Sequence, residues 1–139
     1  MTQTEVVHAH GHEHVSAEHA STFEVTSDDF LTPAGDCILA VEADRTPADF
    51  EASFVDACRD ADATIVATVE AGRHTARIEA RGHPDLTFES DRSLVGRTSE
   101  YVDGRTVAVG ATTAAGDLDR DLVGALADGA ELTLTLTVG

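Results

Sequence analysis

Apolar and polar residues alternate along residues 6–12 and again along residues 75–82. Alternation with a period of two is typical of a strand with one buried and one solvated face. Six further segments have strand-forming patterns: residues 21–26, 37–42, 64–70, 93–99, 105–111 and 131–138. Gly72 is expected to turn the chain between two of these strands, because glycine adopts turn conformations freely. The pattern therefore predicts eight strands.

Two helices are expected, one between the third and fourth strands of each half. The segment Thr46-Pro47-Ala48-Asp49 opens the first with a threonine cap, a proline in the first turn and an acid near the positive end of the helix dipole. Apolar residues then recur on one face: Phe50, Phe54 and Cys58 in the first helix, and Leu118, Leu122, Ala125 and Leu126 in the second. Gly129 is expected to end the second helix.

The same order of elements, βββαβ, occurs twice. Gly11-His12 returns 71 positions later as Gly82-His83, and apolar positions around both pairs correspond. Halves of about 70 residues, 1–70 and 71–139, are marginal alone, so they should share one core in a single domain. We expect a predominantly β, α+β fold in which two pseudo-symmetric repeats form a small barrel or closed sandwich with two helices. Asp103-Gly104 predicts a tight hairpin before the strand at 105–111.

The charge of the chain indicates the salt concentration in which the protein works rather than the kind of molecule that it binds. The formal net charge is −17, with 26 acidic residues, nine arginines and no lysine. At molar salt the Debye length falls to about 3 Å, so such a charge supports solubility without strong self-repulsion. The acids are spread along the chain, which favours adaptation to a salt-rich cytoplasm over an acidic functional tail and gives no reason to expect DNA as a partner.

The compartment is predicted from what the chain lacks. Residues 1–5 have neither the basic nor the apolar region of a signal peptide, and no apolar run approaches the roughly 20 residues that a bilayer requires. Cys37 and Cys58 form no close pair and lie among apolar neighbours, so they are interpreted as core thiols in a reducing cytoplasm. We therefore expect a cytoplasmic protein without a membrane partner.

Four histidines alternate in the segment HAHGHEH, residues 8–14. Their apolar neighbours correspond to core positions of the second half, whereas His8 and His10 correspond to Glu79 and Arg81. His8, His10 and His14 are therefore interpreted as solvated side chains.

His12 alone corresponds to another histidine, His83. If the symmetry axis passed near both, the two imidazoles would form a shared site, with His19 as a third nitrogen ligand and Asp36 at its edge. Three ligands and an open position would suit a divalent metal such as zinc. The alternative is that His12 and His83 brace loops through backbone hydrogen bonds, since no metalloenzyme spacing is present.

Six of the nine arginines lie between residues 73 and 105, where six acids balance them. Arg81, Arg97 and Arg105 are candidates for binding phosphate, a carboxylate or an RNA backbone; a salt-bridged surface is the alternative. One tyrosine and no tryptophan argue against readers of single-stranded RNA. No nucleotide-binding or hydrolase motif is present, and the sequence leaves open whether the protein is an enzyme.

Five segments resemble the archaeal domain-of-unknown-function family 371: GHEHVSAEHAST, LTPAGDCILAV, ARGHPDLTF, GRTSEYVDGRT and AAGDLDRDL. The resemblance runs nearly end to end and implies an archaeal origin but no activity. Two lysines associated with the family pattern are replaced here, in Arg97-Thr98 and Thr112-Thr113.

Two classes of function follow. In the first, the protein binds a small anionic ligand or a metal ion at a site shared by the Gly-His pairs. In the second, it is a non-catalytic interaction module of a larger archaeal assembly, with a protein or ribonucleoprotein partner, that uses the arginine-bearing strand as its contact face.

Overall fold

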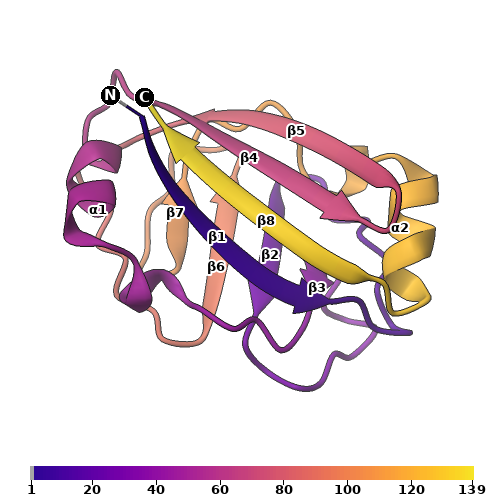
Figure 1. Cartoon of the computed structure of the whole chain (residues 1–139). Coiled ribbons are helices and arrows are strands. Elements are labelled where there is room, and N and C mark those ends of the chain that lie inside the picture. Colours follow the sequence, from indigo (N-terminus) through magenta and orange to yellow (C-terminus); the bar gives the residue numbers. More distant parts are fainter. Residues whose placement is uncertain (1) are drawn as a thin grey trace.

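The computed structural model describes residues 2–139, which form two four-stranded β-sheets with a helix at each end (Figure 1). Sheet A has the order β1-β8-β4-β5, with β1 (Gln3–His10), β8 (Glu131–Val138), β4 (Thr64–Ala71) and β5 (His74–Arg81). Sheet B has the order β3-β2-β6-β7, with β3 (Ile38–Ala40), β2 (Thr22–Thr26), β6 (Ser93–Arg97) and β7 (Thr106–Ala108). The helices are α1 (Ala52–Cys58) and α2 (Arg120–Ala127), preceded by the 3-10 turns η1 (Pro47–Asp49) and η2 (Ala115–Asp117).

The alternating sequence pattern decides which face of each strand is buried. In β8 the side chains of Leu132, Leu134 and Leu136 are buried between the sheets, and the intervening threonines lie on the outer face. In β1, Val7 and Ala9 are buried in the same way. Each fully buried leucine stabilises the fold by about 1.5–3 kcal/mol. The core therefore lies between sheets A and B, as the period-two pattern predicts.

Both halves of the chain contribute strands to both sheets. In sheet A the strands from the two halves alternate, and every neighbouring pair is antiparallel. In sheet B the central pair β2–β6 is antiparallel and its register is centred on the Glu24–Val95 pair, while β3 and β7 run parallel to their neighbours at the edges. Both strand orders are unchanged when β1–β4 are exchanged with β5–β8.

The predicted α+β class, mostly strands with two helices, is confirmed; of the two expected forms, a small barrel or a closed sandwich, the closed barrel is not present. Two separate sheets are present, and within residues 2–139 they are joined at their edges only by single bridges, His10 to Val41 and Arg81 to Val109. The reason is strand length: β3 and β7 have three residues each, whereas β1 and β5 have eight. A three-residue edge strand cannot pair along an eight-residue one, so the sheets do not close.

Of the turns predicted from the sequence, those at two glycines are confirmed and the hairpin at Asp103-Gly104 is not. Gly72 turns β4 into β5 with a φ of 61°, and Gly129 follows α2 with a φ of 87°, both as predicted. The hairpin predicted at Asp103-Gly104 is wrong, because β6 and β7 are parallel and a tight hairpin joins only antiparallel strands. Instead, the Asp103 carboxylate accepts a hydrogen bond from the backbone N–H of Arg105.

The predicted first helix is interrupted. Thr46 and Asp49 form a capping box around η1, but Phe50 has an extended ψ of 148°, so α1 begins only at Ala52. The phenylalanines still face the core: Phe50 and Phe54 pack edge to face, with ring centroids 5.6 Å apart.

Candidate functional site

The loops that follow β2 and β6, residues 27–37 and 98–105, contact the outer face of sheet B through hydrogen bonds to Thr26 and Thr106. Polar side chains of that face are buried beneath them: Thr26, Ser93 and Thr106. Alternation explains why these side chains point outward, because their strand neighbours Val25, Leu94 and Val107 belong to the core. Buried polar groups need partners, and these loops supply them to Thr26 through the Asp28 N–H and to Thr106 through Asp103.

The loop after β6 forms a closed polar network around Arg97, whose side chain is only 11% exposed. Its guanidinium donates to the Thr106 hydroxyl and to the Asp103 carboxylate and lies 4.9 Å from the centre of the Tyr101 ring. Burial alone would raise the pKa of Asp103, but hydrogen bonds from Arg105 and the charge of Arg97 outweigh it and lower the pKa to about 2. The Asp103 carboxylate therefore stays charged and holds both arginines.

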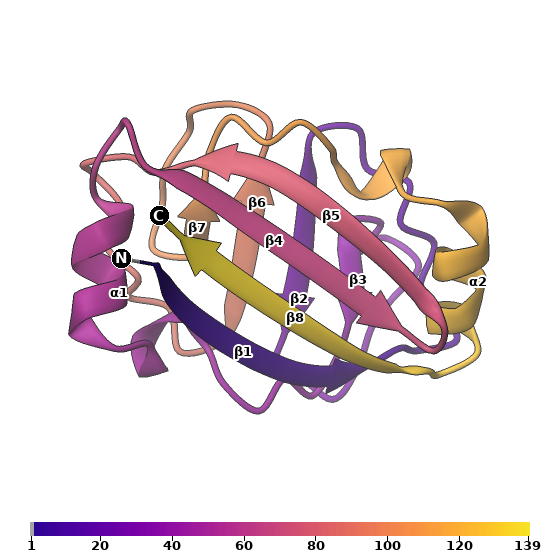
Figure 2. The same ribbon diagram turned by 45° about the horizontal axis from the view of Figure 1, so that its top comes forward.

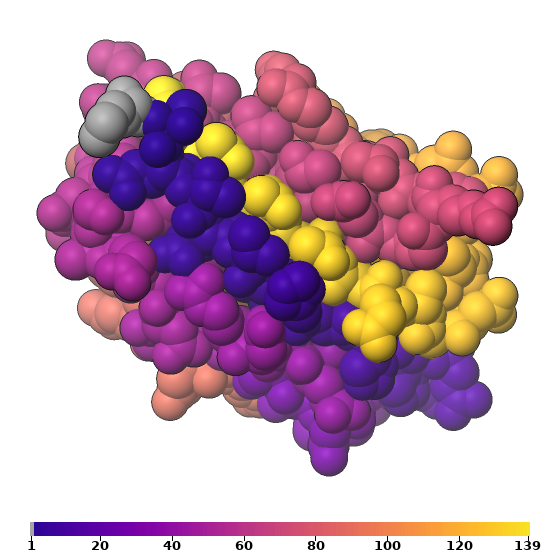
Figure 3. Space-filling view, viewed as in Figure 1, coloured from indigo at the N-terminus to yellow at the C-terminus, as the bar shows by residue number. Residues whose placement is uncertain are grey.

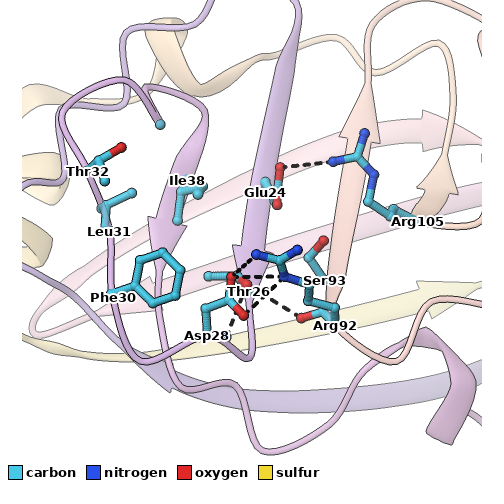
Figure 4. A pocket seen from close by; sticks show the side chains of 11 residues that line it. Glu24, Thr26, Asp28, Phe30, Leu31, Thr32, Ile38, Arg92, Ser93 and Arg105 are labelled. Carbon is cyan, nitrogen blue, oxygen red and sulfur yellow. Dashed lines mark hydrogen bonds and ion pairs between the residues drawn. The ribbon is translucent and has the colours of Figure 1, made fainter.

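The loop after β2 leaves a cavity of about 260 Å³ instead. Figure 4 shows its two kinds of wall, apolar side chains on one side and charged side chains on the other. The apolar wall comprises Phe30, Leu31 and Ile38. The charged wall comprises Glu24, Asp28, Arg92 and Arg105. A cavity with one apolar wall and a few convergent polar groups is the usual form of a small-molecule site.

Both arginines of this cavity are held in place and keep unused donors. Arg92 binds the Asp28 carboxylate through Nε and Nη2 at 2.8–3.1 Å, and Arg105 binds Asp103 through Nε and Nη2 at 3.1–3.4 Å. The Arg105 Nη1 atom lies 3.8 Å from Glu24, beyond hydrogen-bond distance, and the Arg92 Nη1 atom has no partner among residues 2–139. The cavity is thus lined by two oriented guanidinium groups with free donors.

Glu24 lies on β2 at the floor of the cavity. Its carboxylate accepts a 3.5 Å hydrogen bond from the Cys37 thiol. Burial, followed by the charge of Glu24, raises the pKa of Cys37 to about 11, so this sulfur is a thiol and not a thiolate nucleophile at neutral pH. The site can hydrogen-bond and pair charges, but Cys37 does not supply nucleophilic chemistry.

The predicted meeting of His12 and His83 does not occur. Gly11 packs against the end of α2 at Leu126, whereas His83 donates its backbone N–H to Cys58 at the end of α1. These helices lie at opposite ends of the molecule (Figure 2). The reason is topological: β1 and β5 are antiparallel strands at opposite edges of sheet A, so their last residues lie at diagonal corners.

The three candidate histidines have the same local role. The Nδ1 atom of each ring accepts a hydrogen bond from the backbone N–H two residues later, at 3.0–3.2 Å: His12 from His14, His19 from Ser21 and His83 from Asp85. His19 also accepts from the N–H of Thr22. This geometry matches the alternative of loop-bracing histidines. Within residues 2–139 no three His, Cys, Asp or Glu side chains could hold a metal ion together, so the predicted zinc cluster is not formed.

The other predicted residues lie in three places. Arg81 is on the outer face of sheet A, paired with Glu100 at 3.2 Å. Asp36 lies beside His19, whose backbone N–H donates to the Asp36 carbonyl at 3.2 Å. Arg97 and Arg105 do meet, on the Asp103 carboxylate.

Three residues of the cavity were not singled out from the sequence: Glu24, Asp28 and Phe30, whereas Arg92 belongs to the cluster of six arginines noted there. Alternation in TFEVTSDDF places Glu24 on the outer face of its strand, and Phe30 follows two acids in a loop, where an aromatic side chain is unusual. These were the available signals. Arg92 lies 64 positions after Asp28 in the sequence. It reaches the charged wall only because β2 pairs with β6.

None of the helices described within residues 2–139 is long and apolar enough to cross a membrane. In sequence comparisons, the chain is 37% identical over 133 residues to an uncharacterised protein of Methanocaldococcus jannaschii, covering 96% of this chain and 98% of that protein. Residues 7–139 match the family described as "Domain of unknown function (DUF371)". The match spans both sheets, both Gly-His pairs and the cavity, and the chain therefore belongs to the DUF371 family.

Proposed function

We propose that the protein binds a small anionic organic molecule in the cavity on the outer face of sheet B. The observation that carries this proposal is the pair of guanidinium groups of Arg92 and Arg105, which line one cavity with free Nη1 donors. A phosphate or carboxylate between them would accept charge-assisted hydrogen bonds.

The surroundings favour an organic anion over a bare inorganic one. Half of the wall is apolar, through Phe30, Leu31 and Ile38, and would cover a carbon skeleton. Glu24 and Asp28 would accept hydrogen bonds from ligand hydroxyl or amino groups. Asp28 and Asp103 hold the arginines before any ligand arrives, which reduces the ordering cost of binding.

Calorimetric titration with ribose 5-phosphate tests the proposal. Removing one charge-assisted contact through Arg92→Gln or Arg105→Gln should weaken binding by about tenfold or more. Arg73→Gln is the matched control, since Arg73 is exposed on the turn after β4 and does not line the cavity. Absence of binding to the wild type, or equal losses in all three variants, would contradict the proposal.

A second candidate function is an interaction module that docks through sheet A. Figure 3 shows that no loop or helix covers the outer face of β1, β8 and β4. Arg77 and Arg81 are exposed on β5 at the edge of that face, opposite Thr68 and Thr64 of β4. Native mass spectrometry of protein purified from its own cells would test for a retained protein or RNA partner, and Arg77→Glu/Arg81→Glu should abolish its retention.

We also propose that the chain is one folding unit built from an internal repeat, residues 1–70 and 71–139. The alternation of strands from both halves within sheet A supports this, because neither half alone has a complete sheet. Separate fragments should fail to unfold cooperatively. The acidic composition further supports a salt-rich cytoplasm as the setting, so the melting temperature should rise between dilute buffer and molar potassium chloride.

A further inference from the structure

The two most exposed large hydrophobic side chains among residues 2–139, Phe30 and Tyr101, occupy corresponding places in the two loops. Phe30 is 56% exposed and Tyr101 is 62% exposed. Each lies four residues after its strand ends, Phe30 after β2 and Tyr101 after β6. Because an exposed aromatic ring has an energetic cost in water, its recurrence at matched positions calls for a physical reason.

In the second half the reason is visible, because the Tyr101 ring carries a planar partner. The Arg97 guanidinium lies 4.9 Å from the ring centre and is anchored by Thr106 and Asp103. Stacking of a planar cation on an aromatic face is favourable, more so where water is excluded. Here the chain supplies the stacked group itself.

In the first half that partner is missing. The position corresponding to Arg97 is Thr26, since β2 and β6 pair symmetrically, with Thr22 opposite Arg97 and Thr26 opposite Ser93. A threonine is too short to cover the Phe30 ring, and no ring or guanidinium within residues 2–139 stacks on it. The space is the cavity itself, which Phe30 and Thr26 both line (Figure 4).

We infer that the ligand carries a planar ring that stacks on Phe30, in addition to its anionic group. This inference rests on the proposed function and names its ligand class: a ring with hydrogen-bond donors joined to a phosphate, as in a nucleoside monophosphate. The ring would lie where the second half places Arg97, its donors would face Glu24 and Asp28, and its phosphate would lie between Arg92 and Arg105.

The test compares adenosine monophosphate with ribose 5-phosphate, which has the same phosphate group and sugar but no planar aromatic base. The wild type should bind adenosine monophosphate at least about fivefold more tightly, as expected for stacking on one aromatic side chain. Phe30→Ala should weaken the binding of adenosine monophosphate more than that of ribose 5-phosphate and so remove that preference, and Phe30→Tyr should keep it. The matched control is Tyr101→Ala, which should change neither affinity.

The outcomes separate the two proposals. If ribose 5-phosphate binds through Arg92 and Arg105 but the ring adds nothing, or Phe30→Ala weakens both ligands equally, the stacking inference is overturned and the anion site stands. If neither ligand binds, both fail. Phe30 is largely exposed, so its variants should fold; an unchanged melting temperature checks this.

Discussion

The loops after β2 and β6 start from matching strands but are completed in different ways. After β6, Arg97 fills the space beneath the loop and binds Asp103, Thr106 and the Tyr101 ring. After β2, the corresponding space is an open cavity beside Phe30. The same backbone arrangement therefore serves stability where a long side chain fills it, and can serve recognition where a short one leaves it empty.

At the edges of sheet A it is the first half that has an internal ion pair and the second half that lacks one. In the first half Glu5 is buried and binds Arg45 at 2.6 Å, and Arg45 also donates to the Val6 carbonyl. The corresponding residues of the second half are Ala76 and Thr113, which carry no charge. The first half has its internal ion pair at the edge of sheet A, and the second half has its own above sheet B.

The largest effect is expected from Arg45→Thr, which gives the first half the residue of the second. Removing Arg45 leaves the buried Glu5 carboxylate without its cation, and the free energy of unfolding should fall by about 3 kcal/mol. The double variant Glu5→Ala/Arg45→Thr, which reproduces the second half completely, should recover about half of that loss. Urea denaturation measures both. A double variant less stable than Arg45→Thr would show that the two edges are not interchangeable.

Arg97→Ala should have the next largest effect, because it empties the second loop. Asp103 and Thr106 lose a buried partner, and we expect a loss of about 2 kcal/mol. The comparison variant is Arg92→Ala, whose side chain is 66% exposed and whose ion pair should contribute less than about 1 kcal/mol. If Arg97→Ala and Arg92→Ala lower the free energy of unfolding equally, the loop after β6 is not more tightly held by its arginine than the loop after β2.

Acid should affect the second loop selectively through Asp103. Its pKa in the folded protein is about 2, below the ordinary value of about 3.9, so the unfolded chain binds more protons in between. The stabilisation by Asp103 is complete above about pH 4 and is lost as the pH falls towards 2. At pH 2 the loss in the free energy of unfolding should reach about 1–2 kcal/mol. Asp103→Asn should remove that part of the pH dependence. If Asp103→Asn and the wild type lose stability equally steeply between pH 4 and 2, the assignment of this pH dependence to Asp103 is contradicted.

The smallest effect concerns His10, whose counterpart in the second half is Arg81. A hydrogen bond to the Gly11 carbonyl, followed by Glu42, raises the pKa of His10 above its ordinary value, so its stabilising contribution is present at acidic pH and is lost as the pH rises through that raised pKa. Because His10 is 40% exposed, the contribution should be only about 0.3 kcal/mol. Histidine NMR titration should give a pKa above 6.5 that falls in Glu42→Gln. His10→Arg should make stability less dependent on pH near neutrality.

Much of the fold was predictable because burial follows the period-two pattern, which is local. The alternating segments gave all eight strands, and the match between His8 and Glu79 placed both on the outer face. Strand pairing is not local. The sequence cannot indicate that β8 lies between β1 and β4, and without that order the Gly-His pairs appeared able to meet.

The candidate site was predictable only in its arginines. Arg105 and Arg92, which line the cavity, belong to an arginine-rich stretch of an acidic chain, whereas Arg97, also predicted, lies outside the cavity in the closed network around Asp103. The predicted histidine site was wrong because the structure constrains the glycine of each Gly-His pair and not the histidine. A β-carbon at Gly11 or Gly82 would collide with the carbonyl at the end of the adjacent helix. Phe30 could be recognised only once the loops were compared in three dimensions.

The central position of β8 in sheet A has a consequence for synthesis on the ribosome. β1 pairs along its length only with β8, as the partnership of His10 with Glu131 illustrates. β1 must therefore wait, with its inner edge unpaired, until every element between it and β8 has emerged. Sheet A cannot be completed before β8 is translated, and a chain terminated before β8 would expose a β1 edge suited to capture by chaperones or to aggregation.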